Sequence, residues 1–226
     1  MAGLPYPAPT MIALPLLTAL LAGFLHALEP DHMAAVTTFV SRRPRPWQAV
    51  GFGLRWGVGH SAAILVVGLV LVVLGIRMPG SVTQGLEFGV GALLLGLGLW
   101  LLWHVVHERA HALAHQDGEE HHPHHHHGHA HGGSLWVGVA HGLAGSAPLV
   151  ALLPVTLIRS QWLAAGYLLF FGVGTTVAMA LYALLAGAVF QQTGRYLPRL
   201  ASTLRAVTAL GSAALGVFWM FGAVRG

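Results

Sequence analysis

The sequence predicts an all-α integral membrane protein whose six transmembrane helices form two inverted three-helix repeats. Two observations lead to this fold class. Of the 226 residues, 55% are hydrophobic and only 8% are charged, which is far more apolar than a soluble domain of ordinary composition. In addition, blocks in the first half of the chain resemble blocks in the second half at one constant offset.

Six apolar blocks are long enough to cross a bilayer, whose hydrocarbon core of about 30 Å needs about 20 helical residues. They cover residues 11–29, 47–75, 82–104, 135–158, 162–190 and 204–224. The predicted organisation is therefore a first three-helix repeat at 1–104, a His-rich cytoplasmic loop at 105–134 and a second three-helix repeat at 135–226.

The basic residues are all arginine, and the sequence contains no lysine. A phosphate-binding loop that ends in Gly-Lys is therefore excluded, so we expect no nucleotide, and we interpret the arginines as topology signals rather than as a nucleic-acid surface. Most flank the first, third and fifth connections, namely Arg42, Arg43, Arg45, Arg109, Arg195, Arg199 and Arg205, whereas Arg77, Arg159 and Arg225 flank the other side. This bias predicts a multi-pass protein of a bacterial-type inner or plasma membrane, with both termini outside and the long loop in the cytoplasm.

The repeat aligns residues 23–28 with 138–143 and residues 51–61 with 166–176. Because each half contains an odd number of spans, the two halves must cross the membrane in opposite directions. Transporters with inverted repeats bind their substrates near the membrane midplane, where the halves meet and helices are often broken. The duplicated blocks are therefore where we expect the site.

Ionisable side chains are concentrated at the end of the first apolar block: His26, Glu29, Asp31 and His32. Such groups are costly at membrane depth and by default mark an ion pathway. On an unbroken helix, at about 100° per residue, Asp31 and His32 would point away from His26. Pro30 clashes with the carbonyl group four residues earlier, so we expect a break that lets the three side chains share one metal ion. Imidazole and carboxylate together suit nickel, cobalt, zinc or iron. The alternative is an interfacial cluster that only ends the span.

Further polar side chains lie in the duplicated blocks. We predict His60 as a fourth metal ligand, with a structural buried histidine as the alternative. His141 is the repeat partner of His26, and pathway and packing roles are equally open for it. Several hydroxyl groups either line the pathway or cap backbone carbonyl groups. The candidate pathway residues are Glu29, Ser61, His141, Ser146, Thr175 and Thr176.

The polar segment between the third and fourth blocks is rich in histidine. Its first histidines recur every three or four residues, which on a helix that extends the third span would place them in one stripe. The others stand among Gly, Asp and Glu, a composition that binds metals weakly at many points. We predict metal capture by His104, His107, His111, His115, His121, His122, His124, His125, His126, His127, His129 and His131, with a solvated linker as the alternative.

The pattern His26-x4-Asp31-His32, followed by Gly59-His60-Ser61, resembles the nickel/cobalt transporter family, and with six spans the chain looks like its shorter branch of urease-accessory-type membrane proteins. The likeness covers mainly residues 20–65, with weaker support from 138–180. In that family the H-x4-D-H residues are regarded as essential to metal transport. The resemblance therefore implies this role for His26, Asp31, His32 and His60.

We predict a secondary transporter of divalent transition-metal ions that carries Ni²⁺ or Co²⁺ as its substrate, inward for metalloenzyme maturation, with no organic cofactor and with a cytoplasmic metallochaperone as a candidate partner. Ligand type alone does not rank nickel over cobalt, zinc or manganese. Two alternatives remain: a nickel/cobalt exporter for metal resistance, and a non-transporting membrane metallochaperone or sensor. The sequence has no serine-nucleophile motif, and we do not expect an enzyme.

Overall fold

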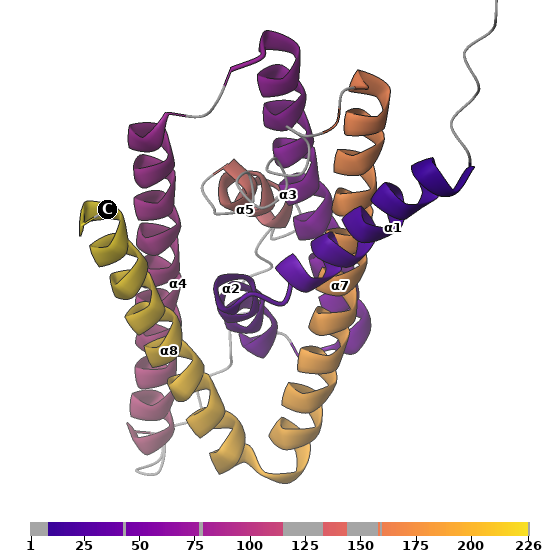
Figure 1. The fold of residues 1–226 in the computed structure, drawn as a ribbon. Coiled ribbons are helices and arrows are strands. Elements are labelled where there is room, and N and C mark those ends of the chain that lie inside the picture. The colour runs from indigo at the N-terminus through magenta and orange to yellow at the C-terminus, as the bar shows by residue number, and fades with distance from the viewer. Residues whose placement is uncertain are drawn as a thin grey trace, which may run out of the picture.

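The computed structural model describes residues 9–42, 44–76, 79–114, 133–143, 158 and 160–225, and the described residues are all-α (Figure 1). Within these ranges, four helices are long and apolar enough to cross a membrane, and a bent helix pair makes a fifth span if it is counted as one. The helices are α1 (Pro9–His26), α2 (Pro30–Arg42), α3 (Pro46–Leu74), α4 (Gly80–Ala114), α5 (Gly133–Leu143), α7 (Gln161–Tyr196) and α8 (Pro198–Arg225). The all-α membrane class is confirmed.

Of the six predicted spans, the second, third, fifth and sixth correspond to α3, α4, α7 and α8. The fourth, predicted at 135–158, is represented by α5, and residues 144–157 lie outside the described residues. Helix α4 continues to Ala114, so the beginning of the predicted loop is helical and the first histidines of the stripe lie on this helix.

The first predicted span is broken at Pro30. Helix α1 ends at His26, where the amides of Leu28 and Glu29 close a tight turn on the carbonyl groups of Leu25 and His26. Helix α2 then begins at Pro30, whose missing N–H costs nothing at the first helical position, and the axis bends by 57°. The sequence analysis predicted the break but treated 30–42 as a connection. These residues instead form a helix.

Helix α2 is too short and too polar to register as a span, yet it occupies the centre of the bundle (Figure 1). It contacts α4, α7 and α8, and its Ala35, Val36 and Val40 belong to an apolar core with Trp56 of α3 and Met179 of α7. This core fixes the start of α2, and with it Asp31 and His32, inside the protein.

The long helices form two pairs, α3 with α7 and α4 with α8, while α1 packs on α7 and α5 packs on α3. Glycines allow these close approaches, because a methyl group on Gly23 would overlap the carbonyl oxygen of Phe171, and one on Gly138 would overlap that of Trp56. The same relation holds for Gly174 against the carbonyl oxygen of Leu20 and for Gly59 against that of Leu135. Helices α1 and α5 are therefore held against α7 and α3 by backbone contact.

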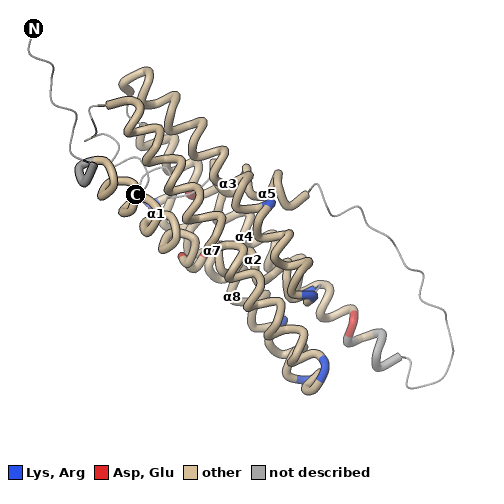
Figure 2. The backbone as a smooth tube through the Cα atoms, turned by 90° about the vertical axis from the view of Figure 1, so that its right-hand side faces the viewer, with Lys and Arg blue, Asp and Glu red and all other residues tan. Residues whose placement is uncertain are grey.

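Charged residues gather toward the end of the bundle where α7 meets α8 (Figure 2). Glu108 of α4 links this end, since its carboxylate lies 3.2 Å from Arg205 of α8 and 3.9 Å from Arg42 of α2. The Arg42 guanidinium also stacks over Trp100, at 5.0 Å from the ring centroid. The ends of α2 and α4 and the start of α8 thus lie on one side of the apolar bundle.

Candidate metal centre

A cluster of imidazole and carboxylate side chains lies where the broken helix pair meets α3 and α5. His26 is the last residue of α1, Asp31 and His32 stand in the first turn of α2, His60 lies midway along α3 and His141 lies near the end of α5. None of these side chains is more than 2% exposed. Residues far apart in the sequence are therefore brought together in the interior of the bundle.

His32 stands at the centre of this cluster. Its Nδ1 lies 3.1 Å from Oδ1 of Asp31, and its Nε2 lies 3.5 Å from Nε2 of His60. Its ring centroid lies 4.6 Å from that of His26, 4.8 Å from that of His60 and 4.5 Å from that of His141. The imidazole ring thus has a neighbour from the cluster at each nitrogen.

Asp31 uses both of its carboxylate oxygens. Oδ1 accepts from Nδ1 of His32, and Oδ2 lies 3.3 Å from Nε2 of His141, which belongs to the other half of the chain. A carboxylate that accepts from an imidazole N–H fixes the tautomer and the orientation of the ring, as it does behind many metal-binding histidines. Asp31 therefore connects the broken helix to α5.

Among the described residues, two groups of three side chains have the spacing of a metal site. The ligand atoms of His26, His32 and His60 lie within 4.8 Å of one another, and so do those of Asp31, His32 and His141. An ion with bonds of about 2.1 Å to four tetrahedral ligands holds the ligand atoms about 3.4 Å apart. The His32–His60 and Asp31–His141 pairs, at 3.5 Å and 3.3 Å, match this spacing, and ligand atoms at the 4.8 Å limit need to approach by about 1.4 Å.

Several imidazole nitrogens have no hydrogen-bond partner within the described part of the chain: Nδ1 and Nε2 of His26, Nδ1 of His60 and Nδ1 of His141. Nδ1 of His26 lies 3.0 Å from Oε1 of Glu29, but at an angle outside hydrogen-bond geometry. Because buried polar atoms are normally satisfied, buried ring nitrogens without partners in a cluster that also contains a carboxylate form a natural environment for a cation.

The geometry brings together His26, Asp31, His32 and His60, the four residues predicted as metal ligands, and it adds His141, for which the sequence left two roles open. The convergence depends on the break at Pro30, as expected. Metal binding by these residues remains a prediction. Glu29 lies at the edge of the cluster, with its side chain 33% exposed.

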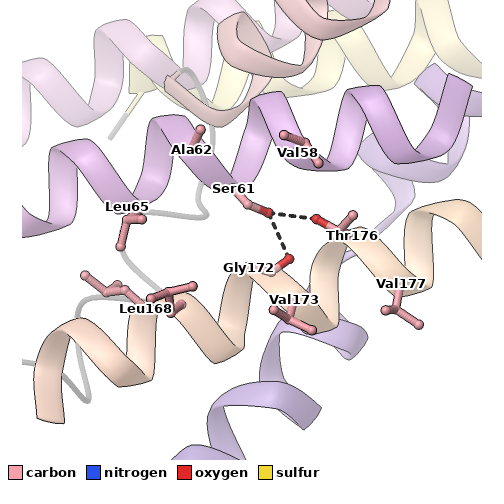
Figure 3. Close-up of a pocket in the computed structure, with 10 residues that line it drawn as sticks. Val58, Ser61, Ala62, Leu65, Leu168, Gly172, Val173, Thr176 and Val177 are labelled. Carbon is pink, nitrogen blue, oxygen red and sulfur yellow. Dashed lines mark hydrogen bonds between the residues drawn. The ribbon is translucent and has the colours of Figure 1, made fainter. Parts of the chain in front are cut away.

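Two of the predicted pathway hydroxyls, those of Thr175 and Ser61, donate to backbone carbonyl groups. Thr175 donates to the carbonyl oxygens of Gly23 and Phe171, at 3.1 and 3.0 Å. Ser61 donates to that of Gly172 at 3.0 Å and lies 3.3 Å from the hydroxyl group of Thr176 (Figure 3). These contacts favour the capping role. Ser146 lies outside the described residues.

The pocket in Figure 3 is a different place from the histidine cluster. It is an apolar groove of about 350 Å³ between α3 and α7, lined by residues such as Val58, Leu65, Val173 and Val177 around Ser61. Val58, Val173 and Val177 are exposed on the outside of the bundle. A groove with this lining suits lipid tails and offers no set of metal ligands.

Two histidines of the predicted stripe have described side chains. Nδ1 of His104 lies 2.8 Å from the carbonyl oxygen of Trp100, and Nδ1 of His107 lies 3.0 Å from that of Trp103, so each ring has Nε2 available for a ligand. His111 lies on the same helix. His115 and the histidines between 121 and 131 lie outside the described residues.

One motif escaped the sequence analysis. Residues 107–111 read His-Glu-Arg-Ala-His, the H-E-x-x-H spacing in which two histidines bind zinc and the glutamate acts as a general base. Here Glu108 is 54% exposed and ion-paired with Arg42 and Arg205, and His107 is exposed. This arrangement differs from a protease site, where a cleft holds a free carboxylate near the metal. That the protein is not an enzyme stays a prediction.

Comparisons with known proteins identify relatives along most of the chain. It is 31% identical to the urease accessory protein UreH of Bacillus sp. strain TB-90 over 212 residues, which cover 91% of this chain and 92% of UreH. It is also 27% identical to the chloroplast proteins FOR GROWTH AND FERTILITY 2 and 1 of Arabidopsis thaliana, over 88% of this chain but only 54% and 57% of those longer proteins. No family model and no solved structure matches. With its histidine cluster inside a bundle of apolar helices and its similarity to UreH over nearly the full length of both chains, this protein belongs to the UreH family.

Proposed function

We propose that this protein is a secondary transporter of divalent transition-metal ions, preferentially Ni²⁺ or Co²⁺, which it takes up for metalloenzyme maturation. The observation that carries the proposal is the buried cluster around His32, in which four imidazoles and one carboxylate meet inside an apolar bundle. Ionisable groups at membrane depth mark ion pathways, and nitrogen-rich ligand sets suit nickel and cobalt better than calcium or magnesium. The relationship to a urease accessory protein supports nickel, because a nickel supply is what urease maturation needs.

The inverted repeat predicted from the sequence supplies the architecture for this activity. The glycine contacts occur in pairs that the repeat relates. Adding 115 to Gly23 gives Gly138, and subtracting 115 from its partner Phe171 gives Trp56, the partner of Gly138. The contacts of Gly174 with Leu20 and of Gly59 with Leu135 are related in the same way. Such reciprocity is expected of two halves related by a pseudo-two-fold axis. It supports rocking of one half against the other as the means of alternating access.

The arginine-rich end of the bundle faces the cytoplasm in this proposal, as the positive-inside rule requires. The His-rich segment follows α4 at this end, since Glu108 near the end of α4 pairs with Arg42 and Arg205. Ions released to the cytoplasm would meet these histidines, which buffer the metal or pass it to a metallochaperone.

Accumulation of radiolabelled nickel in cells tests the proposal. Expression of the protein is expected to raise accumulation, and the double variant His26→Ala, His32→Ala is expected to remove the increase. Ser212→Ala is the matched control, because Ser212 is also a buried polar residue but binds the carbonyl oxygen of Leu94 between α4 and α8. Accumulation below that of control cells would indicate an exporter. A double variant that still accumulates nickel would contradict transport through this cluster.

The metallochaperone alternative is separated by deletion of residues 117–131, which contain the consecutive histidines. A transporter whose loop only buffers the metal retains accumulation after this deletion, whereas a protein that works by handing metal from the loop to a partner does not. Parallel uptake of nickel, cobalt, zinc and manganese establishes the substrate order.

A further inference from the structure

We infer that the cluster provides two alternative positions for one metal ion, one on each side of the His32 ring, and that His141 is a metal ligand at the second position. This inference rests on the proposed transport function and describes how an ion crosses the site. The first position is formed by His26, His32 and His60, and the second by Asp31, His32 and His141.

The orientation of His32 separates the two positions. Nε2 faces Nε2 of His60, while Nδ1 faces Oδ1 of Asp31. The two nitrogens of an imidazole point away from each other in the plane of the ring, so one ion cannot bind both. A neutral imidazole also offers one lone pair at a time: while Nδ1 donates its proton to Asp31 the lone pair is on Nε2, and Nδ1 binds an ion at the second position only after the proton has moved to Nε2. The two positions are therefore filled alternately by a single ion.

The surroundings of the two positions correspond through the repeat. His26 packs against Phe171, with ring centroids 5.5 Å apart, and its repeat partner His141 packs against Trp56, with centroids 5.7 Å apart. Phe171 and Trp56 are themselves separated by the repeat offset of 115 residues. In an inverted repeat, equivalent positions face opposite sides of the membrane. His26 and His141 thus belong to the opposite ends of a short path that passes His32.

The two positions differ in charge. The first contains only imidazoles, whereas the second contains Asp31, whose carboxylate neutralises part of the charge of a divalent ion. A mixed set of two imidazoles and one carboxylate is also a common set for divalent transition metals. An ion bound at the first position is therefore already held by His32, whose other side belongs to the more favourable second position.

The inference makes His60 and His141 separable by experiment. The full-length chain with serine in place of the histidines from His121 to His131, in lipid nanodiscs, is titrated with Co²⁺ and Ni²⁺, and the coordination is measured by X-ray absorption. The wild-type cluster is expected to bind one ion. His141→Ala is expected to bind one ion with nitrogen ligands of the first position, and His60→Ala to bind one ion with the nitrogen and carboxylate ligands of the second. His32→Ala is expected to lose binding at both.

Transport gives the second measurement. Both His60→Ala and His141→Ala are expected to reduce nickel accumulation at least tenfold although each still binds an ion, because the ion can enter one position but cannot proceed. Ser212→Ala should behave as wild type, and far-UV circular dichroism checks that each variant is folded. If His141→Ala accumulates nickel and coordinates metal as the wild type does, the second position is wrong. If His32→Ala accumulates nickel normally, the transport proposal itself fails.

Discussion

Gly142→Ala is expected to disable the metal cluster without removing any ligand. Gly142 of α5 lies directly against α3, and a methyl group at this position would stand 2.5 Å from the carbonyl oxygen of His60 and 2.9 Å from its Cα. Ordinary contact begins near 3.4 Å, so α5 must move away from α3 by about 0.9 Å. The obstructing atoms belong to the backbone, and no side-chain rotation can relieve the overlap.

The displacement acts on the neighbouring residue, His141. Its Nε2 lies 3.3 Å from Asp31, and a movement of about 0.9 Å adds to the approach that the cluster already needs to close on an ion. We expect a loss of about 1–3 kcal/mol in stability, the usual cost of overpacking, and at least a tenfold fall in nickel accumulation. Thermal unfolding in detergent and radiolabelled uptake are the two measurements.

Gly133→Ala is the matched control on the same helix, because nothing lies within 4 Å of a methyl group at Gly133. It should leave both unfolding temperature and uptake unchanged. The reasoning is refuted if Gly142→Ala is as stable and as active as Gly133→Ala, since α5 would then not be held against α3 at His60.

Three further predictions follow from other contacts. Pro30→Ala removes the reason for the break, so α1 can continue into α2 and turn Asp31 and His32 away from His26. Nickel binding, measured by titration, should fall at least tenfold. Pro198→Ala at the start of α8 is the control and should leave nickel binding intact. Glu108→Gln removes ion pairs with Arg42 and Arg205 that are half exposed; stability should fall by less than about 1 kcal/mol, and a larger loss in thermal unfolding would show that this pairing organises the bundle. Tyr182→Phe removes the 2.6 Å hydrogen bond to Thr37 between α7 and α2. The free energy of unfolding should fall by about 0.6 kcal/mol, because Thr37 keeps its hydrogen bond to the carbonyl oxygen of Met33. An unchanged melting temperature would contradict this prediction.

The long helices were predictable because hydropathy over about 20 residues needs no tertiary information. Helix α2 was not, since its thirteen residues carry Asp, His, Thr and Ser and are buried by their neighbours rather than by lipid. Pro30 gave a local reason for the break and hence for the meeting of Asp31 and His32 with His26. The position of His141 depends on a contact across 110 residues of sequence, which only the packing of α5 on α3 provides.

The H-E-x-x-H motif at residues 107–111 is the reverse case, because here the signal was in the sequence and was missed. Their spacing was present in the sequence and was overlooked because the histidines around it were interpreted as a stripe. The packing then decided their meaning, since Glu108 is paired with arginines from two other helices.

The hydrogen bond between Ser61 and Thr176 has a consequence for the origin of the chain. The two residues are 115 apart, so on the proposed repeat each contacts its own counterpart. In a symmetric dimer, self-contacts of this kind occur only where a residue lies on the two-fold axis. A half-length ancestor that assembled as an antiparallel pair would have placed two copies of one hydroxyl residue here. On the proposed repeat, Ser61 and Thr176 are thus the two copies of one position, and His60 and Thr175 beside them are the copies of the next.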